Sequence, residues 1–529
     1  MFAQWKRFGL ISLALVLAGC GTTGGQAPGS EGTTHSQSPL VATMSGTVGT
    51  IDPNKIYSGD EWNAGYLLYR GLYMLNASAQ MVPAVASGMP QVSNNGLTYT
   101  IHLKPGLKWS NGSAITAQDF ADSLKRELNP KTGSPDGYLW TMLQGAQSYE
   151  SGQAKTLSGV TVVNPLAIQY HLSKPYSAFP EILATPAGFP INPAAVSQIS
   201  TKPVTDGPWI LRTWEVGTKM TLAPNPHYTL AQKPRYSGLV VDMGVSPSTS
   251  ILRVQSGQAD WIFDGIPSSQ YAGLQSNPKW SKDMVKFANV GIYLLALNTR
   301  VAPFNKLAVR QAVEMAINKQ HLVRLLQNRG TPANGILPKT LPGFEKDIPN
   351  MYPYNPTKAR QILDQAGFPQ GFTTTLGMAA EGPDGEVIGT EVQNDLKAIG
   401  ITVHLKPLPQ ETTAVAQIPM LTYSWFMDYP DAADFINGFT SCSAAVVGGS
   451  NPAFLCDTKL DQMAKQAQAM PLGPQRTKAF KNADEQAMKD AAYVPLYVPM
   501  TTIFYSTRIH PHLHNPVFGP AIFAAFYSR

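Results

Sequence analysis

The first 19 residues constrain this chain most, because they decide in which compartment the rest of it folds. Lys6 and Arg7 precede an apolar run over residues 8–18. A charged region followed by an apolar one and then small residues is typical of a secretory signal. The run of about 11 residues is too short to cross a bilayer, which takes roughly 20 apolar residues in a helix. The sequence therefore predicts a signal peptide over residues 1–19.

Cys20 directly follows Ala18 and Gly19, and these three residues resemble a bacterial lipobox. The resemblance implies cleavage before Cys20, acylation of its sulfur and a mature protein that begins at a lipid. The alternative is a plain signal cut near Ala18, with Cys20 as a bystander. Residues 20–38 have almost nothing apolar to bury, so we expect a flexible tether. The globular part would then be anchored outside the cytoplasm, in the periplasmic space or on the outer face of the cell membrane.

Length and composition limit the fold and the partners. Removing the signal leaves about 510 residues, more than one hydrophobic core supports, so two or three domains are expected. Charged residues make up 14% of the chain, against roughly 25% in typical globular domains. An acidic medium, in which exposed carboxylates are protonated, is one explanation for this low fraction of charged residues. The net charge of +6 is small and scattered, so no nucleic-acid partner is expected.

The chain has three cysteines, and lipidation of Cys20 would leave an even number. Cys442 and Cys456 then remain, within one loop-like stretch. In an oxidising compartment a disulfide between them is expected. Closing a loop of about 15 residues contributes about 3 kcal/mol in the chain-entropy model. Two buried free thiols are the alternative.

Hydrophobic periodicity predicts helices mixed with strands. Alternating apolar residues predict strands at 97–103, 160–162, 168–172, 401–405 and 493–505. Capping residues and apolar stripes predict helices from Thr116, over 308–326, between Asn355 and Gly367, over 386–399 and around 478–489. In the helix over 308–326, Arg310, Glu314 and Arg324 are expected on the solvent side. A helix, then Gly400, then a strand is typical of an α/β fold.

No motif for catalysis stands out. The chain has no P-loop, no H-E-x-x-H and no G-x-S-x-G elbow, and its one literal G-x-G-x-x-G lies in the lipobox and tether. His510, His512 and His514 have a spacing that could ligate nickel or zinc. Pro511 argues against a regular strand there, and no nearby cysteine or carboxylate completes the set. We expect no metal site and no cofactor.

Residues 425–435 set carboxylates among aromatic side chains, and four of them are candidate ligand-binding residues: Trp425, Asp428, Tyr429 and Asp431. A desolvated carboxylate needs a cationic or hydrogen-bonding partner, and a ligand's ammonium group could be that partner. The alternative is that Asp428 and Asp431 form turns beside Pro430.

Several stretches of this chain match known motifs. Residues 95–112 read NGLTYTIHLKPGLKWSNG, which is similar to the signature DGLTYTFHLRKGVKFHDG, and a matching helix follows at 115–120. Shorter matches are 206–209 to GTGPY, 225–228 to NPxY, 309–319 to VRQALSYAIDR and 366–372 to AGYPNGF. Together they resemble the family 5 solute-binding proteins of ABC transporters, which carry oligopeptides, dipeptides and nickel. The resemblance covers nearly the whole mature chain.

The resemblance implies an α/β fold of the periplasmic-binding-protein type, with two hinge-linked lobes and an extra small α/β domain. Ligand would be captured between the lobes by hinge closure. The implied parts are lobe I at 39–65, 201–292 and 500–529, the extra domain at 66–200, lobe II at 293–499, and crossing segments near 293–298 and 494–499.

The resemblance also implies residue roles. Asp428 matches the carboxylate that binds a peptide's α-ammonium group, a strong charge-assisted contact. Trp425 matches a pocket-lining tryptophan, and Tyr429 adjoins the same site. Cys442 and Cys456 match a disulfide loop of the dipeptide-binding branch.

One stretch departs from that branch. Residues 381–386 are acidic where the dipeptide-binding proteins have an arginine for the ligand's carboxylate. A free carboxylate would be poorly received there, so a longer peptide or another cationic solute fits as well as a dipeptide. We expect a monomeric, non-enzymatic receptor that delivers peptides to an ABC permease and its ATPase subunits. Uptake of nickel chelates or oligosaccharides, and an exported hydrolase, are the alternatives.

Overall fold

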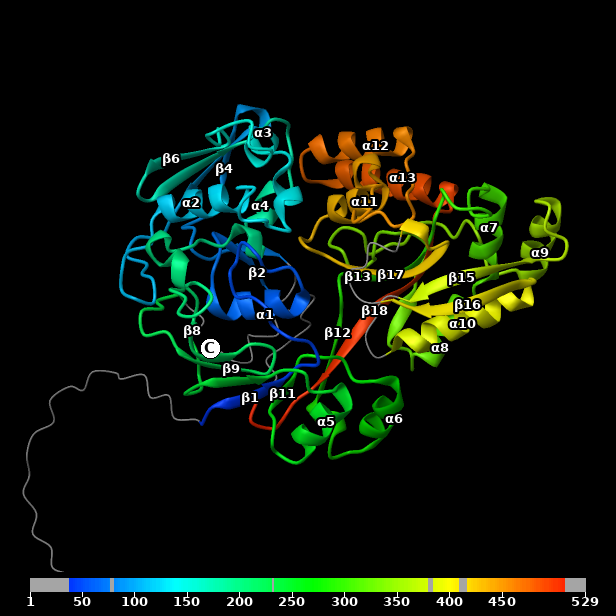
Figure 1. Ribbon diagram of the computed structural model, residues 1–529, viewed down its shortest axis with the longest axis horizontal. Helices are drawn as coiled ribbons and strands as arrows, with labels where there is room; N and C mark the ends of the chain where they lie inside the picture. The colour runs from blue at the N-terminus through cyan, green and yellow to red at the C-terminus, as the bar shows by residue number, and fades with distance from the viewer. Residues whose placement is uncertain (1–37, 77–79, 231–232, 379–383, 409–415, 510–529) are drawn as a thin grey trace, which may run out of the picture. The chain divides into compact units, whose positions relative to one another are not determined.

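The computed structural model describes residues 38–76, 80–230, 233–378, 384–408 and 416–509 (Figure 1). Cys20 and the tether up to residue 37 lie outside these ranges, as do His510, His512 and His514. The described strands form three larger sheets and one two-stranded sheet. Within the described ranges, no helix has the length and apolar character that a membrane span requires.

The first sheet has the order β11-β1-β10-β9-β8, and its strands come from 40–43 and from 209–262. β1 is parallel to β10 and β11, whereas β8, β9 and β10 are antiparallel neighbours. The strands are β1 Leu40–Thr43, β8 Trp209–Glu215, β9 Lys219–Pro224, β10 Leu239–Asp242 and β11 Trp261–Ile262. The helices in these parts of the chain are α1 Gly59–Leu68, α5 Pro247–Gln255 and α6 Ser268–Ser276.

The second sheet, β4-β5-β7-β6, is antiparallel throughout. Its strands are β4 Gln91–Ser93, β5 Thr98–His102, β6 Val160–Asn164 and β7 Ala167–His171. The neighbouring elements are β2 Tyr73–Leu75, β3 Met81–Pro83, α2 Ala117–Glu127, a 3-10 helix Gly137–Trp140, α3 Ala146–Glu150 and α4 Phe179–Ile182. As expected, α2 begins after Thr116, whose backbone N–H donates to the carboxylate of Asp119 at 2.8 Å.

The third sheet has the order β12-β18-β13-β17-β15-β16, with β14 paired to β18. Its strands are β12 Met284–Ala288, β13 Gly291–Leu297, β14 Gly330–Pro332, β15 Phe372–Met378, β16 Ile401–Pro407, β17 Met420–Phe426 and β18 Tyr493–Phe504. The helices are α7 Leu307–Ala316, α8 Lys319–Leu325, α9 Pro356–Gln365, α10 Gly385–Ala398, α11 Ala432–Thr440, α12 Thr458–Ala469 and α13 Pro474–Asp490.

Helices cover both faces of the third sheet, with α11, α12 and α13 on one and α8 and α10 on the other (Figure 1). Alternate residues of β13 show this: Ile292 and Leu294 pack into the same core as α11–α13, whereas Leu295 and Leu297 pack with α7–α10. The α11–α13 core also contains residues of the 66–200 segment, such as Phe179. The 66–200 segment therefore shares one continuous hydrophobic core with this side of the sheet.

The single helix predicted over 308–326 is wrong. Ile317 has extended backbone after α7, and the Asn318 side chain caps α8 by accepting from His321 N. Glu314 is also buried rather than solvated, and it pairs with Lys319 at 2.7 Å. Arg310 is buried too and donates to the backbone oxygen of Asp490. The partner of Arg310 lies 180 residues away, which a helical stripe cannot reveal, whereas Lys319 is near Glu314 in sequence but belongs to the next helix.

The motif at 206–209 fastens the start of β8 to the end of α1. The carboxylate of Asp206 accepts a hydrogen bond from Arg70 N at 3.0 Å. A Cβ on Gly207 would lie 2.4 Å from the backbone of Leu68, so only glycine allows this approach. The motif therefore has a structural explanation.

Candidate functional site

The carboxyl ends of the parallel strands point to the site. β15 runs parallel to both β16 and β17, so these strands end at the same edge of the third sheet. In α/β sheets, ligands bind outside the carboxyl ends of the strands. β17 is followed by residues 427–431 and then by α11, which places all four candidate residues at or just beyond its carboxyl end.

Asp434 accepts hydrogen bonds from two residues at the end of β17. Its Oδ2 accepts from the Trp425 indole N–H and from Asp428 N, both at 3.0 Å. Asp434 lies in the first turn of α11 and is 4% exposed. One buried carboxyl thus joins the strand, the turn and the helix, and holds Trp425 and Asp428 in place.

The Asp428 carboxylate is half-buried and faces the 66–200 segment. Its Oδ2 accepts a 2.5 Å hydrogen bond from the hydroxyl of Tyr138, in the 3-10 helix Gly137–Trp140. Loss of hydration raises the pKa of Asp428 to about 6, although hydrogen bonds from Tyr138 and Asp434 oppose the rise. Burial and the charge of Asp428 raise the pKa of Asp434 well above its ordinary value.

Asp431 has a different partner from the one considered in the sequence. Both of its oxygens accept from the guanidinium of Arg476, at 2.6 and 2.7 Å, and Oδ1 also accepts from Ala433 N to cap α11. Asp431 is 6% exposed and Arg476 5%. Arg476 also stacks over the ring of Phe480 on α13. The charge of Asp431 is therefore already balanced within the protein.

Tyr429 joins the same two parts of the chain as Asp428. Its hydroxyl lies 2.6 Å from that of Tyr176, and both side chains are buried. A weaker backbone contact, from Ser177 N to Gln468 O at 3.4 Å, lies alongside. The surroundings of Asp428 are thus enclosed by residues from both the 66–200 segment and the 427–476 region.

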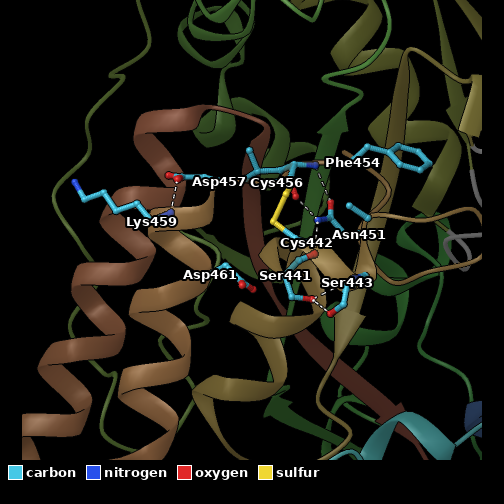
Figure 2. The surroundings of a disulfide bond; sticks show 12 residues. Ser441, Cys442, Ser443, Asn451, Phe454, Cys456, Asp457, Lys459 and Asp461 are labelled. Carbon is cyan, nitrogen blue, oxygen red and sulfur yellow. Dashed lines mark hydrogen bonds between the residues drawn. A yellow bond between two sulfur atoms is a disulfide. The ribbon is translucent and has the colours of Figure 1, made fainter. Parts of the chain in front are cut away.

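The structure contains the expected disulfide between Cys442 and Cys456, with an S–S distance of 2.04 Å (Figure 2). The buried Asn451, inside the loop, donates to Leu455 O and accepts from the hydroxyl of Tyr493 on β18. Ser450 donates to the carbonyl oxygen of Gly438 in α11. The loop is therefore attached to the helix that carries Asp434.

The acidic stretch at 381–386 is partly neutralised. Asp384, at the start of α10, pairs with Arg329 at 2.5 Å, while residues 381–383 lie outside the described ranges. Arg329 also donates to Ile266 O and to the Ser268 hydroxyl. Its guanidinium is fully engaged, so it does not offer an open site for a ligand's carboxylate.

Sequence reasoning missed three residues that build this site: Tyr138, Asp434 and Arg476. Asp434 had a signal, because it lies in the same aromatic and acidic segment as Asp428. Tyr138 and Arg476 had none, because they are 290 and 45 positions away from their partners. Among the described residues, no group of three or more His, Cys, Asp or Glu side chains is placed to hold a metal ion.

Comparison with known proteins identifies the family. The sequence pattern described as "Bacterial extracellular solute-binding proteins, family 5 Middle" matches residues 80–446. The chain belongs to family 5 of the bacterial extracellular solute-binding proteins. It is thus a solute-binding protein of an ABC importer, and its family is extracytoplasmic.

Relatives of this family 5 protein agree in sequence and in fold. The glutathione-binding protein GsiB of Salmonella typhi is 26% identical over 484 residues, which cover 89% of this chain and 91% of that protein. The Escherichia coli murein tripeptide binding protein MppA superposes with a TM-score of 0.81 at 23% identity, covering 93% and 98% of the two chains. DppA from Helicobacter pylori, in complex with the peptide STSA, gives 0.79 at 22% identity with the same coverage. These structures confirm the two-lobed fold that the sequence predicts.

Proposed function

We propose that this family 5 protein captures peptides through their free α-ammonium group and delivers them to a membrane permease. One observation carries the proposal. Asp428 is half-buried and partly desolvated, yet no Lys, Arg or His within the described ranges forms an ion pair with it. Its neighbour Asp431, by contrast, has Arg476. A desolvated carboxylate without a cation favours a ligand that brings one.

The named relatives support a peptide as the ligand. They bind glutathione, a murein tripeptide and the peptide STSA, according to their names. These compounds share peptide bonds and an amino group. In our proposal Trp425 lines the pocket, Tyr429 positions the 66–200 segment through Tyr176, and Asp431 orients α11 instead of touching the ligand.

We propose further that the lobes follow the sheets. Lobe I is built on the first sheet, the extra domain on the second and lobe II on the third. β13 and β18 pair as antiparallel neighbours, which supports the crossing segments at 293–298 and 494–499. Tyr138 already contacts Asp428 in this structure, so opening of the lobes would separate the two residues to admit a ligand, and closure would bring them back around it.

The anchor completes the proposal. An acylated Cys20 would keep the monomeric receptor close to its permease and so raise the local concentration for docking. Mass spectrometry of the protein purified from its source should show the acyl mass on Cys20. A Cys20→Ala variant should leave the membrane fraction, and a variant that stays membrane-bound contradicts lipid anchoring.

A ligand screen tests the function itself. Thermal shift and calorimetry with peptides, nickel-histidine and oligosaccharides should show stabilisation by peptides. Stabilisation only by sugars or nickel chelates would refute the peptide assignment. Mass spectrometry of the recovered peptide should show it intact, and cleavage would support the hydrolase alternative.

A further inference from the structure

A second carboxyl group lies near Asp428 on the opposing segment. Asp136 comes two residues before Tyr138 and is 2% exposed. Its Oδ1 has no hydrogen-bond partner in the described part of the chain. Burial, then the charges of Glu127 and Asp428, raise the pKa of Asp136. The charge of Asp136 also raises the pKa of Tyr138, so Asp136 lies near the hydrogen bond between Tyr138 and Asp428.

Three arginines of the segments that meet here already have partners. Arg126 pairs with Asp52, and Arg476 pairs with Asp431. Arg70 donates to the backbone oxygens of its own helix end.

The charge of Asp428 acts on both Asp136 and Asp434, and Glu127 acts on Asp136 from the other side. None of these four carboxyl groups forms an ion pair with a Lys, Arg or His of the described residues. Three of the four accept hydrogen bonds: Glu127 from Asn54 and Ser134, Asp428 from Tyr138, and Asp434 from Trp425. The buried Oδ1 of Asp136 accepts no hydrogen bond from the described part of the chain. An unpaired buried carboxyl is costly unless a partner arrives with the ligand.

We propose that the site selects ligands with two positive charges at one end, such as peptides that begin with lysine. The α-ammonium group would bind Asp428, and the side-chain ammonium group would bind Asp136. This inference rests on the proposed peptide-binding function. A lysine side chain suits this site because its ammonium group lies at the end of a flexible aliphatic chain that can reach a second carboxylate.

Calorimetry on the full chain tests the inference with two tetrapeptides, Lys-Ala-Ala-Ala and norleucine-Ala-Ala-Ala. Norleucine has a straight aliphatic side chain without the charge. We expect the lysine peptide to bind about tenfold tighter at pH 7, the effect of one charge-assisted hydrogen bond. It should also release about one more proton, because a cation favours ionised Asp136; titrations in buffers of different ionisation enthalpy measure this.

The variant Asp136→Asn should lose the preference for lysine and keep its affinity for the norleucine peptide. Asp122→Asn, which changes a more exposed carboxylate on α2 of the same segment, should keep the preference. Equal affinities in the unmodified protein overturn the inference and leave peptide capture intact. A preference that survives Asp136→Asn also overturns it. If neither peptide binds, the proposed function fails as well. The unmodified protein decides the first outcome even if a variant does not fold.

Discussion

The hydroxyl of Tyr138 donates a 2.5 Å hydrogen bond to the carboxylate of Asp428, 290 positions along the chain. This bond joins the 66–200 segment to the carboxyl end of β17. In the proposed function, the Tyr138 hydroxyl occupies the place that a ligand's ammonium group would take. Tyr138 is 46% exposed, so its side chain has room to give way to a ligand.

Replacing Asp428 with Asn should weaken the binding of peptides with a free amino terminus by about 10- to 100-fold, because the ammonium group loses its anionic partner and keeps only a neutral amide oxygen as acceptor. N-acetylated peptides should bind both proteins alike. Calorimetry with each pair of peptides measures the difference. An equal loss for free and acetylated peptides would contradict the ammonium-binding role.

The pH dependence of binding should follow Asp428. Its pKa is about 6 in the protein, so affinity for a free-amine peptide should fall as the pH drops from 7 to 5. The Tyr138→Phe variant removes a hydrogen bond that lowers this pKa, and the midpoint should move to higher pH. Tyr354→Phe, at an exposed tyrosine far along the chain, is the control. An unchanged midpoint in Tyr138→Phe would show that the bond does not form in solution.

The free energy of unfolding should rise as the pH is lowered from 9 towards 5. Burial raises the pKa of both Glu127 and Asp206 to about 8. The folded protein therefore binds more protons than the unfolded chain between about pH 4 and 8, and this stability is lost as the pH rises through 8. Asp206→Asn should reduce the slope in urea unfolding experiments at several pH values. A protein that becomes more stable from pH 5 to 9 would contradict the assignment.

Breaking the Asp431–Arg476 ion pair should lower the free energy of unfolding. Arg476→Met leaves a buried carboxylate unpaired and should cost about 3–5 kcal/mol in the free energy of unfolding. Asp431→Asn combined with Arg476→Met should cost less, because the unpaired charge is gone. Lys465→Met breaks an exposed pair with Asp461 and should cost under about 1 kcal/mol. A small loss in Arg476→Met would mean that water reaches Asp431.

Removing the disulfide should lower the free energy of unfolding by about 3 kcal/mol, because the loop then gains entropy in the unfolded chain. The variant carries Cys442→Ser and Cys456→Ser together. Urea unfolding of this variant and of the reduced native protein should agree. If the variant is as stable as the oxidised protein, the two thiols are not joined.

Local patterns predicted those elements whose causes are local. The start of α2 at Thr116 follows from a capping carboxylate three residues on, and α9 lies between Asn355 and Gly367 as its end signals indicate. The helix over 308–326 was predicted wrongly for the opposite reason. The backbone becomes extended at Ile317, and Arg310 donates to the backbone oxygen of the distant Asp490 at the end of α13. Periodicity reports which residues are apolar, but not which charged residues become paired inside.

The sequence by itself determined the α/β class, the cysteine pair and the acidic, aromatic segment that contains Asp428, and it predicts an export signal. Each of these depends on residues close together in the chain. Only the tertiary structure decided which carboxylate is paired with a cation and which is not. Arg476 reaches Asp431 and Tyr138 reaches Asp428 because helix packing and sheet pairing bring distant segments together. Desolvation at that junction, which no single segment contains, gives Asp428 its raised pKa and leaves its charge without a cation.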